Sequence, residues 1–217
     1  MNRSTAASAF GAVAFTVLYL AATFLPSLPE GAYSDAEVLG LLQDSGSRNL
    51  IIVGSLLYIA SGLALLPFVA QLTATLRRTD PDSPLVGVVF GSGLLYVAML
   101  LMAGNVFGAN AIGIAVGEVP MPEDATLVRV LSDLGFVTLL IPGLLSAAVM
   151  IVAASLLARR SQALPRWVCV TGFVVAPLLM LGAAWVPQFL VPLWTLMAGF
   201  SLRPEPVAET TPTPALP

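Results

Sequence analysis

The sequence predicts an all-α fold, a polytopic helical membrane bundle with about six transmembrane helices. Hydrophobic residues make up 58% of the 217-residue chain and charged residues only 10%, whereas soluble domains have roughly 45–50% and 25%. The mean hydropathy is +0.93. Several apolar runs reach the roughly 18 residues that a membrane-spanning helix needs. We therefore treat residues 1–202 as one transmembrane domain in contact with the lipid bilayer.

The ionisable residues exclude several kinds of chemistry. All nine basic residues are arginine, and the chain has no lysine and no histidine. A Schiff base needs a lysine, histidine-ligated zinc or haem needs a histidine, and a Ser-His-Asp triad would lack its base. The single cysteine, Cys169, can form neither an internal disulfide nor a CxxC pair. We expect no enzyme activity, no cofactor and no metal, and the absence of a basic cluster argues against a nucleic-acid partner.

The first span is predicted over residues 5–25, immediately before Pro26. A secretory signal peptide is the competing interpretation, in which this segment would be cleaved. Arg3 is the only basic residue before the apolar run, and the run is long for a signal peptide. These features favour a retained span.

The loop after the first span is predicted to contain a short amphipathic helix on the extracytoplasmic side. Ser34 and Glu37 fit the capping-box pattern S-x-x-E, which marks a helix start. Val38, Leu41 and Leu42 follow at the spacing of one apolar helix face. Such a helix would lie on the membrane surface or over the mouth of the bundle.

The central stretch Ser83–Gly117 carries no charge over 35 residues. As one helix it would be about 52 Å long, against a hydrocarbon core of about 30 Å. Division into two spans would leave no room for a turn. We therefore predict one span over residues 84–106, with the segment Gly104–Asn110 forming its frayed or redirected end.

The remaining spans are predicted over residues 50–76, 134–158, 167–186 and 189–202. Pro142–Gly143 is expected to kink the fourth span. The sixth is short and contains Pro192, so a re-entrant segment is the alternative. Residues 203–217 hold five prolines among threonine and glutamate, a composition typical of a disordered tail.

With six spans the charges separate between the two sides of the membrane. One side holds seven arginines and the other holds two, Arg48 and Arg129. An excess of arginine marks the cytoplasmic side. The sequence therefore predicts a plasma-membrane protein with both termini in the cytoplasm and an acidic cap outside. The seven cytoplasmic arginines are Arg3, Arg77, Arg78, Arg159, Arg160, Arg166 and Arg203.

Four polar residues near the outer membrane boundary form the candidate site: Asn105, Asn110, Arg129 and Asp133. Amides at membrane depth are costly unless hydrogen-bonded, so they tend to face the bundle interior. They could bind a polar ligand or line a water-filled path, but bridging two helices is the simpler role. For Arg129 and Asp133, four residues apart, a local ion pair is the simpler expectation.

Pairs of glycines four residues apart predict faces where helices approach closely. These pairs are Gly87 with Gly91, Gly104 with Gly108, and Gly113 with Gly117. Such small-xxx-small faces pack helices in lipid. They could form a homo-oligomer or bind a membrane-protein partner, and packing within the bundle is the alternative.

Three segments resemble uncharacterised bacterial integral membrane proteins of the domain-of-unknown-function families common in actinobacteria. They are D-S-G-S-R-N before the second span, N-V-F-G-A-N at the end of the third, and L-A-R-R-S-Q-A-L-P-R-W before the fifth. The resemblance implies a membrane fold and brings no catalytic residues.

The leading hypothesis is a non-catalytic structural, partner-binding or sensory subunit. The alternative is a small transporter or channel with a path past Asn105, Asn110 and Asp133.

Overall fold

A computed structural model of the chain describes residues 3–25, 34–181 and 186–202. These residues form helices joined by turns and contain no strand, which confirms the all-α prediction. The predicted tail, residues 203–217, lies outside the described residues. In chain order the elements are α1 (Arg3–Phe24), α2 (Asp35–Gln43), α3 (Ser45–Thr79), α4 (Pro84–Ala115), α5 (Thr126–Thr138), the π-helical turn η1 (Leu139–Gly143), α6 (Leu144–Ser161), α7 (Arg166–Leu179), the 3-10 turn η2 (Val186–Phe189) and α8 (Leu190–Ser201).

Four helices are long and apolar enough to cross a membrane, which supports a membrane-embedded protein. They are most of α1, all of α3, all of α4, and the helix formed by α5, η1 and α6. By contrast, α7 has 14 residues and α8 has 12. At 1.5 Å per residue they span about 21 and 18 Å, less than a hydrocarbon core of about 30 Å. The six complete spans therefore stay a prediction, and the short α8 fits the re-entrant alternative for the sixth span by length.

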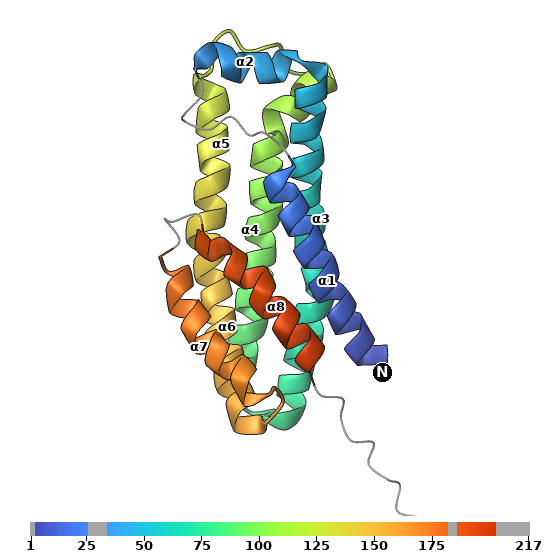
Figure 1. Cartoon of the computed structure of the whole chain (residues 1–217), viewed down its shortest axis with the longest axis vertical. Coiled ribbons are helices and arrows are strands. Elements are labelled where there is room, and N and C mark those ends of the chain that lie inside the picture. The colour runs from blue at the N-terminus through green and yellow to red at the C-terminus, as the bar shows by residue number, and fades with distance from the viewer. Residues whose placement is uncertain (1–2, 26–33, 182–185, 203–217) are drawn as a thin grey trace, which may run out of the picture.

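Six helices close into a ring around an apolar core. Neighbours in the ring are α1, α3, α4, α6, α7 and α8, and α8 packs back against α1. Figure 1 shows α1, α7 and α8 beside one half of the bundle, while α3, α4 and α5 continue beyond them toward α2. The largest fully buried side chains include Trp194, Tyr96, Phe15 and Phe68, which lie on different helices of the ring.

The two ends of the bundle differ in charge. We call the end that carries α2 the cap end, and the opposite end the basic end. The last turns of α3 and α6 carry Arg77, Arg78, Arg159 and Arg160, and α7 begins at Arg166. In Figure 1 these helix termini all lie at the end farthest from α2. The fold therefore gathers these five arginines of the predicted cytoplasmic side at one end.

The predicted break at Gly104–Asn110 is wrong, because α4 continues as a regular helix to Ala115. The helix ends instead in a Schellman motif, in which Gly117 has a φ of +76°. The N–H of Gly117 donates to the carbonyl of Ile114 at 3.1 Å, and the N–H of Glu118 donates to that of Gly113 at 3.1 Å. A left-handed residue favours glycine, so the helix terminates there and not at the earlier glycines.

Gly104 and Gly108 have a packing role that explains the continuous helix. A methyl group added at Gly104 would lie 2.8 Å from the backbone oxygen of Ser55 on α3. The Ser55 hydroxyl donates a hydrogen bond to the carbonyl of Gly104 at 2.7 Å. At Gly108 the added methyl would collide with the Ser55 side chain. These glycines therefore allow α3 and α4 to approach closely.

The helical geometry changes at Pro142, where the sequence predicts a kink. Residues Leu139–Gly143 form one π-helical turn between α5 and α6. Proline has no N–H to donate and its ring clashes with the preceding turn, so a wider turn accommodates it. The Ser146 hydroxyl then donates to the carbonyl of Gly143 at 2.7 Å.

Candidate functional site

The short helix α2 covers the cap end of the bundle, which is one of the two positions that the sequence predicts. It lies across the ends of α3, α4 and α5 (Figure 1). Its buried residues Val38 and Leu42 belong to a small second core, separate from the main one. The other buried members of this core come from the three long helices: Ile51, Ala111, Ala125 and Val128. The apolar face predicted for α2 therefore packs on the helix ends.

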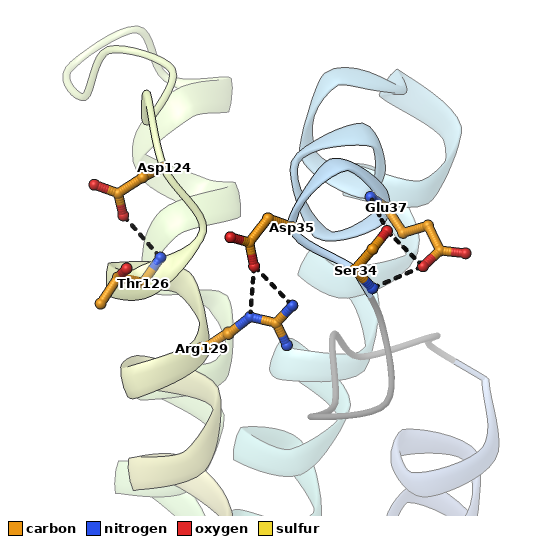
Figure 2. A network of polar contacts seen from close by, with 6 residues as sticks. All are labelled: Ser34, Asp35, Glu37, Asp124, Thr126 and Arg129. Carbon is orange, nitrogen blue, oxygen red and sulfur yellow. Dashed lines mark hydrogen bonds and ion pairs between the residues drawn. The ribbon is translucent and has the colours of Figure 1, made fainter.

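The capping box predicted for α2 is confirmed. The Glu37 backbone N–H donates to the Ser34 hydroxyl at 3.4 Å, and the Ser34 N–H donates to Oε2 of Glu37 at 2.7 Å. The Ser34 hydroxyl also donates to Oε2, at 2.8 Å. Figure 2 shows these contacts at the start of the helix. The hydrogen bond from the Ser34 backbone, then that from its hydroxyl, holds the pKa of Glu37 below its ordinary 4.5.

Polar contacts also fix the opposite end of α2, where the chain turns into α3. Asp44 ends α2 and caps α3, accepting a hydrogen bond from the Ser47 N–H at 2.7 Å. This hydrogen bond is the main reason that the pKa of Asp44 lies below its ordinary value of 3.8. The Arg48 guanidinium donates to the carbonyl of Leu42 at 2.8 Å, which satisfies the last turn of α2. Both ends of the cap helix are therefore fixed by polar contacts.

We expect α2 to loosen in acid through Glu37. Because its pKa is lower in the folded protein, its contribution to helix stability is complete above about 4.5. That contribution is lost as the pH falls from about 4.5 through the lowered pKa of Glu37. The rate of hydrogen exchange of the α2 amides, corrected for the intrinsic effect of pH, should therefore rise as the pH falls through this region.

The variant Glu37→Gln is the control for this acid effect. Its side chain still accepts a hydrogen bond but does not titrate, so the exchange of its α2 amides should retain only the pH dependence due to Asp44. An equal acid response in both proteins would contradict the assignment to Glu37.

Arg129 connects α5 to α2 through Asp35. The distance from Nη2 of Arg129 to Oδ1 of Asp35 is 3.0 Å, and Nε lies 3.3 Å from the same oxygen. Figure 2 shows the guanidinium between the two helices. The side chain of Arg129 is 24% exposed and that of Asp35 is 76% exposed. An exposed pair of this kind contributes about 0–1 kcal/mol, so it orients the cap more than it stabilises it.

The expected local pair between Arg129 and Asp133 is wrong. Asp133 is exposed and forms no ion pair or hydrogen bond with another described residue. The four-residue spacing indicates that the two side chains are near each other, but it does not reveal that the tertiary fold places Asp35 beside Arg129.

The two asparagines do not share one polar site. Asn105 is exposed, and its amide donates to the carbonyl of Leu101 on its own helix at 2.9 Å. Asn110 is half-buried and lines a cavity of about 10 Å³ together with Val128 and Ser132 of α5. A void of this size holds one water molecule at most. Asn110 therefore lies beside α5, but the cavity between α4 and α5 is too small for a solute.

The structure contains a buried group of hydrogen-bonded side chains that the sequence analysis did not predict. The Tyr19 hydroxyl donates to Oε1 of Gln188 at 2.7 Å, and the hydroxyls of Thr23 and Tyr58 lie 3.0 Å apart. The rings of Tyr19 and Tyr58 meet edge to face with centroids 5.8 Å apart. Gln188 is only 2% exposed. The cluster ties α1 and α3 to the turn before α8.

The sequence does not reveal these contacts, because the hydrogen-bonded residues are far apart in the chain. The partners are 169 residues apart for Tyr19 with Gln188 and 35 for Thr23 with Tyr58. No periodic pattern connects positions so distant. Because these four polar groups are paired with one another, the cluster is suited to fixing the helices in place.

Comparison with protein-family models, with curated proteins and with solved structures found no match to this chain. The resemblance to actinobacterial membrane proteins of unknown function therefore stays a prediction.

Proposed function

We propose that this chain is a plasma-membrane subunit without catalytic activity that acts by binding a membrane-protein partner, first of all a second copy of itself. Both termini lie in the cytoplasm, and α2 forms an acidic, outward-facing cap suited to sensing. The grouping of arginines at the basic end supports this orientation, since arginine is enriched on the cytoplasmic side.

The close packing beside the candidate polar residues carries this proposal. A transporter needs a path that a solute can enter, whereas the cavity at Asn110 has a volume of about 10 Å³. Asn105 faces outward and is bonded to its own helix. The centre of the ring is filled by fully buried aromatic side chains, Trp194 and Tyr96 among them. Binding through the outer helix faces fits this interior better than transport through it.

Gly87 and Gly91 on α4 offer a face for such a partner. Both are exposed, and a methyl group added at either would meet no atom within 4 Å. Gly104 and Gly108 differ, because they contact α3 within the bundle. Paired small residues on an outward face let a second helix approach closely in lipid. The structure thus separates the glycine pair used internally from one that is free for association.

Disulfide crosslinking in native membranes tests the proposal. Cys169 is buried and is the only cysteine, so Cys169→Ser gives a background without thiols. On this background we expect Gly91→Cys to form a covalent dimer under mild oxidation, because a symmetric contact brings the two thiols together. Adding Gly87→Leu, which fills the face, should reduce the dimer severalfold.

Val149→Cys is the matched control. Val149 is exposed on α6, next to Met150, whose sulfur lies 3.1 Å from a methyl group added at Gly93 of α4. It therefore lies at a depth similar to Gly91 but on another helix. Equal crosslinking at both positions would indicate random collision. Two results together would contradict the proposal. One is that every cysteine variant stays monomeric. The other is that no partner protein co-purifies with the chain and is lost from the Gly87→Leu variant.

A further inference from the structure

An open groove lies on the outer surface of α3 and α4 at the basic end. It has a volume of about 410 Å³ and is lined by Ala70, Thr73, Ala74, Arg77, Arg78 and Phe90. Five of these residues belong to the last turns of α3, and Phe90 forms the wall on α4. Known small-molecule sites have volumes of about 300–1,000 Å³. The groove is therefore large enough to hold part of a lipid.

The lining changes from apolar to basic along the helix axis. Ala70 and Ala74 are one turn apart, and their small side chains leave the hollow that Phe90 borders. Arg77 and Arg78 follow in the last turn of α3. The parts of a phospholipid follow the same order, with apolar acyl chains toward the centre of the membrane and a charged phosphate at the membrane boundary. The groove thus matches a lipid in direction as well as in composition.

Two polar groups of the groove have unused hydrogen-bonding capacity. Thr73 is 6% exposed, and its hydroxyl has no hydrogen-bond partner among the described residues. Two residues later, Thr75 donates to the carbonyl of Gln71 at 2.9 Å, the usual arrangement for a helical threonine. Arg77 is exposed and forms no ion pair with Asp80, Asp82 or any other described residue. A ligand with acceptor oxygens would complement the exposed guanidinium of Arg77, whereas the buried Thr73 hydroxyl is not accessible from the groove.

The geometry points to a binding site for an anionic phospholipid, with its phosphate on Arg77 and Arg78 and an acyl chain along Ala70, Ala74 and Phe90. Guanidinium groups bind phosphate through paired, charge-assisted hydrogen bonds. Basic pockets between membrane helices on the cytoplasmic side recognise lipid headgroups in this way. The apolar wall distinguishes this ligand from a free anion, which would use only the arginine end.

Native mass spectrometry of the full chain in detergent tests this site with phosphatidylglycerol as the probe. We expect phosphatidylglycerol to bind more tightly than phosphatidylcholine, which carries no net charge. The variant Arg77→Gln should weaken phosphatidylglycerol binding about fivefold, since one arginine at a membrane surface contributes about 1 kcal/mol. Ala74→Phe, which fills the hollow without changing the charge, should also weaken binding.

Arg160→Gln is the matched control, because Arg160 is exposed in the last turn of α6 at the same end and does not line the groove. It removes the same charge and should leave binding unchanged. Equal losses in Arg77→Gln and Arg160→Gln would overturn the site in favour of general electrostatic attraction. Equal binding of the two lipids, or displacement of phosphatidylglycerol by inorganic phosphate, would also overturn it. Circular dichroism of each variant shows whether a loss reflects unfolding, and a folded Ala74→Phe protein with unchanged binding would overturn the acyl position.

Discussion

Replacing Trp194 with alanine is expected to lower the free energy of unfolding by about 3 kcal/mol. The Trp194 side chain is fully buried and meets Phe68 of α3 edge to face, with ring centroids 6.4 Å apart. Its indole N–H donates to the carbonyl of Val168 on α7 at 3.4 Å. This loss of stability lies at the lower end of the range measured for the cores of soluble proteins. Membrane helices stay in lipid when they separate, so the variant loses side-chain packing but no apolar surface moves into water.

Trp167→Ala is the control for this substitution. Trp167 is 53% exposed at the start of α7, so its removal leaves no cavity and should change the free energy by at most about 0.5 kcal/mol. Denaturant titrations of both variants in mixed micelles measure the difference. Equal losses would mean that α8 is not packed into the ring as described.

Replacing Gly104 with alanine is expected to destabilise the protein by about 1–3 kcal/mol, the usual cost of overpacking. The added methyl would lie 2.8 Å from the backbone oxygen of Ser55 and 2.8 Å from Cγ1 of Ile59. Backbone cannot move aside as a flexible side chain can. Separation of α3 from α4 would also weaken the hydrogen bond from Ser55 to the Gly104 carbonyl.

Gly91→Ala on the same helix should instead raise the free energy of unfolding. No atom lies within 4 Å of the added methyl, and alanine favours a helix by about 0.5–1 kcal/mol over glycine. Alanine is still small, so the comparison does not depend on association with a partner. The same mixed-micelle titration applies, and a Gly104→Ala protein as stable as Gly91→Ala would contradict the close approach of α3 and α4.

Local sequence signals were sufficient where the structure depends on neighbouring residues. The capping box of Ser34 and Glu37 is formed as its spacing indicates, and Pro142 does interrupt the regular helix. The same reasoning misplaced the end of α4, since it treated Gly104 as a helix breaker. That glycine lies in a helix interior because α3 packs against it, which is information from 49 residues away in the chain.

The sequence did not predict the contacts of the candidate site residues. Asn110 does lie beside α5 at the cap end, whereas Asn105 faces outward on its own helix. Arg129 was paired with Asp133 from their spacing, yet its ion-pair partner Asp35 is 94 residues distant. Such a pair depends on where α2 is folded over the bundle. Sequence periodicity cannot specify that position.

The amino-acid sequence alone indicates that this protein is helical and suited to a membrane, and where most of its helices lie. These properties follow from hydropathy and capping, which act within a few residues. The folded arrangement of the helices, in contrast, is needed to see which glycines pack inside, which face outward, and how the arginines of α3 border a groove. Those outcomes depend on which helices become neighbours, and the packing of side chains from distant segments determines that choice.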